Sequence, residues 1–239
     1  MVRREARTYV RAMSIRTLAL ALLLTFSAVA AAPALARFVA LPTGPPPPGT
    51  LPQCQPGDLR TPRDGYHEWA QSLLDTEHRL TADYVPPDLR AATLPGGKVS
   101  LRAFVIPELE AMLAAAKADG VSIVVTSGYR SYQRQAAVYQ QMVEERGDAY
   151  ARLSAARPGH SEHQLGTTVD LKGGAEWLDR NARRFGFVRS YPDGRSPAWT
   201  CYKPESWHYR YFGRQRAAQI YMSGLSPREW LWLNTATLD

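Results

Sequence analysis

The sequence is poor in the residues that build most metal sites and most thiol chemistry. Its 239 residues include two cysteines and five histidines, with no CxxC pair, no Cys/His cluster and no HExxH segment. These absences argue against a cysteine-based metal site and exclude the helix-borne HExxH zinc arrangement. No internal repeat is visible either, which argues against a structural binding protein built from repeats.

A concentrated block of basic residues is also missing. The formal net charge is +7, but the first 36 residues carry +4 of it, which leaves a mild +3 spread over the rest of the chain. No Lys/Arg run is interleaved with aromatic residues. Proteins that bind nucleic acid usually gather such residues on one face, so we expect no nucleic-acid partner.

The chain contains no apolar run long enough to cross a bilayer as a helix. Five arginines precede an uncharged apolar run of 15 residues over 18–32, and the small-x-small segment Ala34-Leu35-Ala36 follows it. This order is typical of a secretory signal peptide, whereas a membrane-spanning helix needs about 20 residues. We therefore expect residues 1–36 to be a signal peptide and the mature protein to be exported to the periplasm or cell envelope without a membrane span. An uncleaved anchor is the alternative, and either Met1 or Met13 is the start.

The residues after the predicted cleavage site favour an extended linker and then one domain. Residues 43–52 (TGPPPPGTLP) suit a polyproline spacer, so we assign 37–53 to a Pro-rich linker and 54–239 to a single domain. Both cysteines, Cys54 and Cys201, fall within that domain. An even count in an exported protein favours a disulfide between them, and two separate thiols are the alternative.

Apolar periodicity and turn residues predict an α+β domain, with helices packed on a small, mainly antiparallel sheet. The clearest helix begins at Pro107, which suits a first turn, and ends before Gly120. The spacing predicts helices over 66–79, 107–119, 131–146 and 175–185, and strands over 121–126, 167–171 and 207–211.

The candidate metal ligands are few enough to be enumerated. His163 and Asp170 lie seven residues apart around Gly166, and Glu205 precedes His208 by three residues. Catalytic zinc needs about three His or carboxylate ligands and an open position, which these residues could supply. A second carboxylate left unligated could accept a proton from water. The spacing alone is not specific, because isolated histidines are common in folded cores and surfaces.

Three segments give a more specific signal together. Residues 158–170 read PGHSEHQLGTTVD, residues 205–210 read ESWHYR, and residues 127–131 read SGYRS with Gln135 and Tyr139 following. They resemble the signatures of the VanY-type D-alanyl-D-alanine carboxypeptidases, and they occur along the chain in the order that this family shows. Residues 80–89 (LTADYVPPDL) are similar to that family's upstream segment, so the resemblance covers about residues 73–212. Thr168 departs from the pattern, where the family often has alanine.

The resemblance implies a zinc site carried on the sheet of a Hedgehog/DD-peptidase fold. In that family's pattern the zinc ligands would be His163, Asp170 and His208. Glu205 would be the general base, and Arg130 would contact the substrate or the transition state. The resemblance also suggests two substrate contacts, Ser161 and Gln135.

The implied function is a zinc-dependent D-alanyl-D-alanine carboxypeptidase that acts on peptidoglycan stem peptides. Two enzyme alternatives share this site, an L,D-carboxypeptidase and an endopeptidase that cuts cross-links. A third alternative, of another class, is a non-catalytic zinc-bearing module that binds the cell wall. Glu205 argues against that module, because a protein without catalysis has no need for an unligated carboxylate at this position.

Overall fold

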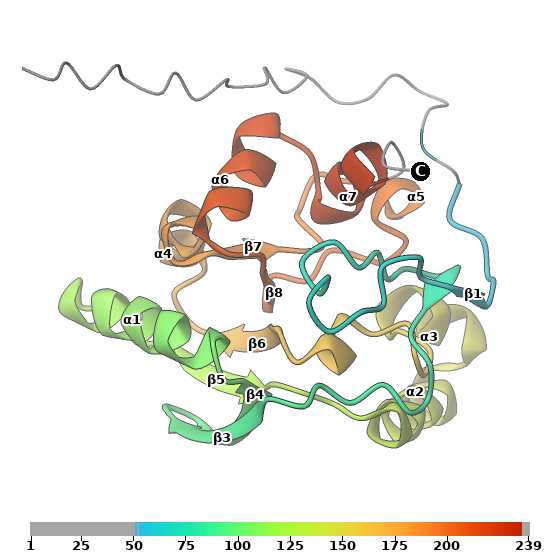
Figure 1. The fold of residues 1–239 in the computed structure, drawn as a ribbon, viewed down its shortest axis with the longest axis horizontal. Coiled ribbons are helices and arrows are strands. Elements are labelled where there is room, and N and C mark those ends of the chain that lie inside the picture. The colour runs from blue at the N-terminus through green and yellow to red at the C-terminus, as the bar shows by residue number, and fades with distance from the viewer. Residues whose placement is uncertain (1–50, 52, 236–239) are drawn as a thin grey trace, which may run out of the picture. The chain divides into compact units, whose positions relative to one another are not determined.

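The computed structural model describes residue 51 and residues 53–235. The predicted signal peptide and all of the predicted linker except residues 51 and 53 therefore lie outside the described residues. At the centre of the described chain is a four-stranded sheet in the order β5-β6-β8-β7, with every neighbouring pair antiparallel (Figure 1). Its strands are β5 (Val124–Ser127), β6 (Thr168–Lys172), β7 (Phe187–Arg189) and β8 (His208–Tyr211).

Helices surround this sheet, so the predicted α+β class is confirmed (Figure 1). The helix α1 packs on one face of the sheet. The helices α2 and α3 are consecutive in the chain. The helices are α1 (Val105–Ala118), α2 (Tyr132–Arg146), α3 (Asp148–Ser154), α4 (Ala175–Asn181), α5 (Pro197–Thr200), α6 (Arg214–Ser223) and α7 (Pro227–Thr235). Two 3₁₀ turns are η1 (Glu162–Leu165) and η2 (Ala182–Phe185).

The two faces of the sheet differ in chemistry because side chains alternate along a strand. Val169 and Leu171 of β6, with Tyr209 and Tyr211 of β8, point into the main core against α1. The residues between them, including Asp170, must then point to the opposite face. This alternation separates an apolar face that stabilises the sheet from a polar face that carries the site.

Two smaller two-stranded sheets are separate from the central sheet. The strands β3 (Leu89–Leu94) and β4 (Gly97–Arg102) form an antiparallel hairpin. The amide of Tyr129 donates to the carbonyl of Ser100 (2.8 Å), which ties this hairpin to the segment after β5. The two-residue strands β1 (Leu59–Arg60) and β2 (His78–Arg79) form a short parallel pair.

Most predicted elements are confirmed, and one is wrong. The predicted helices over 107–119 and 131–146 correspond to α1 and α2, and the predicted helix over 175–185 is divided into α4 and η2. The three predicted strands correspond to β5, β6 and β8. The predicted helix over 66–79 does not form, because that segment consists of turns and irregular chain that ends in β2.

Tertiary contacts explain why residues 66–79 are not helical. The apolar residues with helical spacing enter three different clusters: Trp69 packs with Phe104 and Tyr211, Leu73 beside Phe212, and Leu74 beside Leu80. A helix would place all three on one face. The carbonyls of Trp69 and Ser72 instead accept hydrogen bonds from Nη2 of Arg210, at 2.7 and 2.9 Å.

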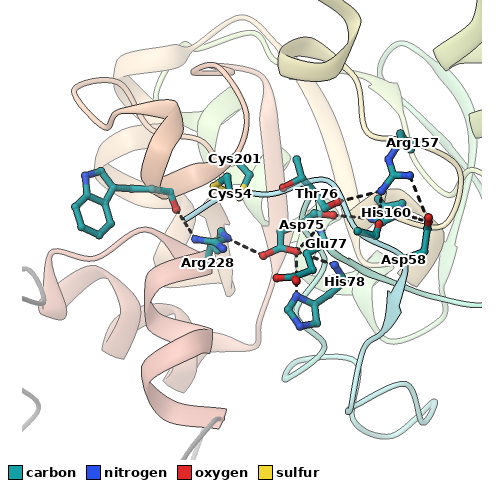
Figure 2. Close-up of polar contacts among 12 residues, drawn as sticks. Cys54, Asp58, Asp75, Thr76, Glu77, His78, Arg157, His160, Cys201 and Arg228 are labelled. Atoms are coloured by element: carbon teal, nitrogen blue, oxygen red, sulfur yellow. Dashed lines mark hydrogen bonds and ion pairs between the residues drawn. A yellow bond between two sulfur atoms is a disulfide. The ribbon is translucent and has the colours of Figure 1, made fainter. Parts of the chain in front are cut away.

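Two links hold this irregular N-terminal segment to the rest of the chain (Figure 2). The predicted disulfide between Cys54 and Cys201 is confirmed. Beside it lies a group of polar residues that we call the Asp75 cluster, defined as Asp58, Asp75, His78, Arg157, His160 and Arg228. Asp75 is its centre: the carboxylate accepts from Nε of Arg228 at 2.8 Å, and the backbone carbonyl faces Nδ1 of His160 at 2.7 Å.

Candidate active site

The structure brings His163, Asp170 and His208 together on the polar side of the sheet. Asp170 and His208 are direct partners across β6 and β8, and His163 comes from η1, just before β6. One ligand atom from each residue lies within 4.8 Å of the other two. Nε2 of His163 and Nδ1 of His208 are 3.3 and 3.5 Å from Oδ1 of Asp170. The strand register therefore sets two of the ligands, and the turn into β6 sets the third.

Gly166 makes that turn possible. It ends η1 with φ of 72°, in the left-handed region that glycine adopts most readily. A Cβ at this position would also lie 3.0 Å from side-chain carbons of both Arg102 and Leu89. Any other residue would strain the backbone and crowd the hairpin, so the chain needs glycine to bring His163 beside Asp170.

Both imidazoles are oriented by a partner on their far side. Nδ1 of His163 is 2.7 Å from the carbonyl of Gly128, which can only accept a hydrogen bond, so Nδ1 is the donor. Nε2 of His208 is 3.0 Å from a carboxylate oxygen of Glu162. A neutral imidazole carries one proton, so the nitrogens that face Asp170 would carry lone pairs.

This arrangement fits a bound cation. Nε2 of His163 and Oδ1 of Asp170 are buried and have no hydrogen-bond partner among the described residues. Leaving buried polar atoms unpaired costs free energy, and a metal ion would satisfy both of them. Two nitrogens and one carboxylate oxygen, with a cavity on the open side, are the donor set of a catalytic zinc site.

The electrostatics of the site point the same way. Burial lowers the pKa of His163 to about 4, so this imidazole is neutral at pH 7. Burial also disfavours charge on His208, but the carboxylates of Asp170 and Glu162 beside its two ring nitrogens outweigh burial and raise the pKa of His208 to about 10. The field that favours a proton on His208 would equally favour a divalent cation, which must displace that proton to bind.

Glu205 lies in the turn before β8, on the cavity side of His208. Its Oε2 is 3.3 Å from Nδ1 of His208, and its side chain is 14% exposed. Burial raises the pKa of Glu205 to about 7. A carboxyl group with this pKa can both accept and release a proton near neutral pH, as a general base requires.

Arg130 follows β5 and lines the same cavity as Glu205. Its Nη2 is 3.5 Å from Oδ2 of Asp170, and its Nη1 donates to Oε1 of Gln135 at 3.0 Å. Gln135 in turn donates to the carbonyl of Ala156 at 2.6 Å. Both polar ends of Gln135 are engaged within the protein, so it holds the guanidinium of Arg130 in place.

These residues line one cavity of about 220 Å³. Ser161 lines it as well, and its hydroxyl accepts from the amide of His163 at 3.3 Å, which caps η1. Trp207 is half exposed and also lines the cavity. A larger cavity of about 520 Å³ lies between α4, β7 and α6, but its Asp179 and Arg189 are paired at 3.4 Å. The unpaired ligand atoms of His163 and Asp170 belong to the smaller cavity, which is therefore the candidate site.

Sequence reasoning missed one residue of this site. Glu162 is buried beneath His208 and Arg210, although it stands directly before His163 in the sequence. A signal was available: side-chain alternation in β8 places His208 and Arg210 on one face, and a buried arginine needs a carboxylate. His160 is also buried, because it belongs to the Asp75 cluster, where its Nδ1 lies 2.7 Å from the carbonyl of Asp75.

Comparisons with known proteins agree with this geometry. A family model described as "VanY: D-alanyl-D-alanine carboxypeptidase" matches residues 98–214. A D-alanyl-D-alanine carboxypeptidase of Enterococcus faecalis (strain ATCC 700802 / V583) is 35% identical over an alignment of 183 positions, which covers 69% of this chain and 66% of that protein. The chain thus spans about two thirds of that relative's length.

Two solved structures share the fold. A Zn(II) complex of a mutant vancomycin resistance D,D-pentapeptidase VanY, from a VanB-type resistance cassette, superposes with a TM-score of 0.61 at 34% identity. It covers 70% of this chain and 99% of that one. A complex of VanYB with D-alanine-D-alanine gives a TM-score of 0.62 at 33% identity, over 72% of this chain and 99% of the other.

Proposed function

The chain belongs to the VanY family of D-alanyl-D-alanine carboxypeptidases, and we propose that it removes the terminal D-alanine from cell-wall peptides that end in D-alanyl-D-alanine. One observation carries the proposal: the unpaired ligand atoms of His163 and Asp170 face a cavity that also holds Glu205 and Arg130. A metal site, a proton acceptor and a carboxylate-binding cation are what peptide hydrolysis at a free C-terminus requires.

His163, Asp170 and His208 would hold the zinc ion, through Nε2, a carboxylate oxygen and Nδ1. Zinc held there would supply Lewis acidity, which polarises the scissile carbonyl and acidifies water. Gly128 and Glu162 orient the two imidazoles from behind, so the ligands are set before any ion binds.

Glu205 would act as the general base and then as the acid. It takes a proton from the attacking water as the new C–O bond forms, and it delivers that proton to the leaving amine as the C–N bond breaks. The products are the shortened peptide and free D-alanine. Its position beside His208, without a place among the three ligands, leaves its carboxylate available for this transfer.

Arg130 would bind substrate through its guanidinium. Its planar fork suits either the terminal carboxylate of the peptide or the oxyanion that develops during attack. Gln135 would support this contact by fixing the guanidinium, and Ser161 would offer its hydroxyl to the peptide within the same cavity.

The test is to incubate the zinc-loaded domain with pentapeptide, tetrapeptide and cross-linked stems and to identify the products by mass. We expect loss of one D-alanine from the pentapeptide. Cleavage confined to the tetrapeptide or to the cross-link would favour an L,D-carboxypeptidase or an endopeptidase. The control is Glu205→Gln, which should keep its zinc but lose about 10²–10⁴-fold in rate. Full activity in this variant would place the base elsewhere.

We also propose that the protein is exported, with residues 1–36 as a cleaved signal peptide. The Cys54–Cys201 disulfide supports an oxidising compartment, because such bonds rarely persist in the cytosol. Among residues 51 and 53–235, no helix is long and apolar enough to cross a membrane. N-terminal sequencing of the protein recovered from the envelope should give a start near Arg37. An intact start at Met1 or Met13 on exported protein would instead indicate an anchor.

A further inference from the structure

Glu162 is a buried carboxylate with no direct part in the proposed hydrolysis. Its side chain is 5% exposed and contacts three polar groups. One oxygen accepts from Nη1 of Arg210 at 2.8 Å, and the other accepts from the hydroxyl of Ser190 at 2.5 Å and lies 3.0 Å from Nε2 of His208. Taking a carboxylate out of water is costly, so a purely structural position would be filled more cheaply by an apolar residue.

The geometry points to Glu162 as a positioning residue that selects the tautomer of His208, an inference that rests on the proposed zinc site. A metal ligand must be a neutral imidazole with one proton, and a carboxylate accepts but cannot donate, so Glu162 keeps that proton on Nε2. Nδ1 of His208 is then left with its lone pair toward Asp170 and Glu205, at 3.5 and 3.3 Å. With the opposite tautomer, Nδ1 would carry a proton and could not ligate a metal.

Arg210 fixes Glu162 in turn. Its Nη1 pairs with Glu162, while its Nη2 donates to the carbonyls of Trp69 and Ser72, at 2.7 and 2.9 Å. The arginine side chain is fully buried. A continuous chain of hydrogen bonds therefore runs from the irregular N-terminal segment through Arg210 and Glu162 to the imidazole of His208.

The two histidines give a comparison within the same site. The carbonyl of Gly128 orients His163, and no side-chain substitution removes this acceptor. A side chain orients His208, so its tautomer control can be altered by mutation. A charged acceptor also raises the basicity of the ligand nitrogen more than a neutral carbonyl does.

The main test is Glu162→Gln, with Glu229→Gln as the matched control. Glu229 is an equally buried glutamate, but its partners are the amide of Ser226 at 2.7 Å and Arg195 at 3.4 Å. The amide introduced at position 162 can donate to Nε2 and so permits the tautomer that blocks Nδ1. We expect zinc affinity, measured by competition with a chelator, to fall about 10–100-fold in Glu162→Gln and to stay at the wild-type value in the control.

Imidazole ¹⁵N spectra of the wild-type protein test the tautomer of His208 directly, whereas the zinc affinity of the variants tests the role of Glu162. We expect His208 to show a protonated Nε2 in the zinc-loaded protein; a protonated Nδ1 would overturn the inference. If Glu162→Gln does not fold, Glu162→Asp retains the charge but withdraws the acceptor, and it should also bind zinc more weakly. Wild-type zinc affinity in a folded variant would equally overturn the inference. Neither readout requires peptide hydrolysis, so failure of the proposed activity and failure of this inference are distinguishable.

Discussion

Two buried polar clusters of this chain use the same residue types but differ in how fully their atoms are bonded. In the Asp75 cluster, Oδ1 of Asp75 accepts from the amides of Glu77 and His78 at 2.9 and 2.8 Å, and Oδ2 accepts from Arg228 (Figure 2). In the active site, Oδ1 of Asp170 has no hydrogen-bond partner among the described residues. The nitrogen nearest to it, Nε2 of His163, is unpartnered as well within that part of the chain.

Charge alone does not separate the two clusters. Burial opposes ionisation of both aspartates, yet the pKa of Asp75 is held well below its usual range by His78 and Arg228, and that of Asp170 by His163 and His208. Both carboxylates are therefore ionised at neutral pH. The difference lies in hydrogen bonding: a saturated cluster stabilises the fold, whereas a cluster with unpaired lone pairs is arranged for a ligand.

Exchanging each aspartate for asparagine should separate these two roles and produce the largest effects on zinc affinity and on stability. Asp170→Asn removes a ligand, so we expect zinc affinity to fall by more than about 100-fold, beyond the 10–100-fold typical of changes to a ligand's partners. Asp75→Asn removes the negative charge that balances the buried guanidinium of Arg228. We expect it to lower the free energy of unfolding by about 3–5 kcal/mol.

The measurements are zinc content and denaturant unfolding of the metal-free protein, made on both variants. Asp170→Asn should lower the free energy of unfolding less than Asp75→Asn does, because Asp170 has fewer hydrogen-bond partners, and folded Asp75→Asn should bind zinc normally. The opposite pattern, with Asp75→Asn losing zinc and Asp170→Asn losing stability, would contradict the distinction between the clusters.

The sequence predicts elements that local signals determine better than elements that distant contacts determine. Local signals fixed the helix over 107–119, because a proline start and a glycine end are read within a few residues. The β3–β4 hairpin was missed, although Pro95 and Gly96 form its two-residue turn and gave a local signal. The error over 66–79 was of another kind, since contacts with Arg210, far along the chain, decide that segment.

The residues of the site also differ in how well the sequence predicts them. The three proposed zinc ligands came from the resemblance of contiguous motifs, and the structure brings their potential ligand atoms together. The role of Glu162 depends on side chains of residues 190, 208 and 210. Alternation in β8 groups residues 208 and 210 and calls for a carboxylate near them, but no local pattern identifies that carboxylate as Glu162. Partners that orient a ligand are set by the packing of distant segments, so one sequence without a fold reveals them poorly.

The smallest expected effect is on the pH dependence of stability and concerns His160. This residue belongs to the Asp75 cluster and lies three residues before His163 of the active site. Burial lowers the pKa of His160, and Asp58 and Arg157 are the charged groups that face it. The folded protein therefore keeps this imidazole neutral at pH values where the unfolded chain takes up a proton. Its contribution to stability is complete above the unfolded pKa of about 6.5 and is lost as pH falls from there toward the lower folded value.

His160→Gln should remove that pH-dependent contribution. We expect the variant to be less stable than the wild type by about 1 kcal/mol at pH 7.5, because it loses the hydrogen bond to the carbonyl of Asp75. The difference in unfolding free energy between the wild type and the variant should narrow as pH falls to 5.5, since only the wild type still has a buried imidazole to protonate. Unfolding free energies of the metal-free proteins across this range provide the measurement, with the exposed His67→Gln as control. A gap that stays constant with pH would show that His160 does not titrate differently in the folded protein. In that case the Asp75 cluster would stabilise the fold through geometry alone, with no dependence on the protonation of its histidine.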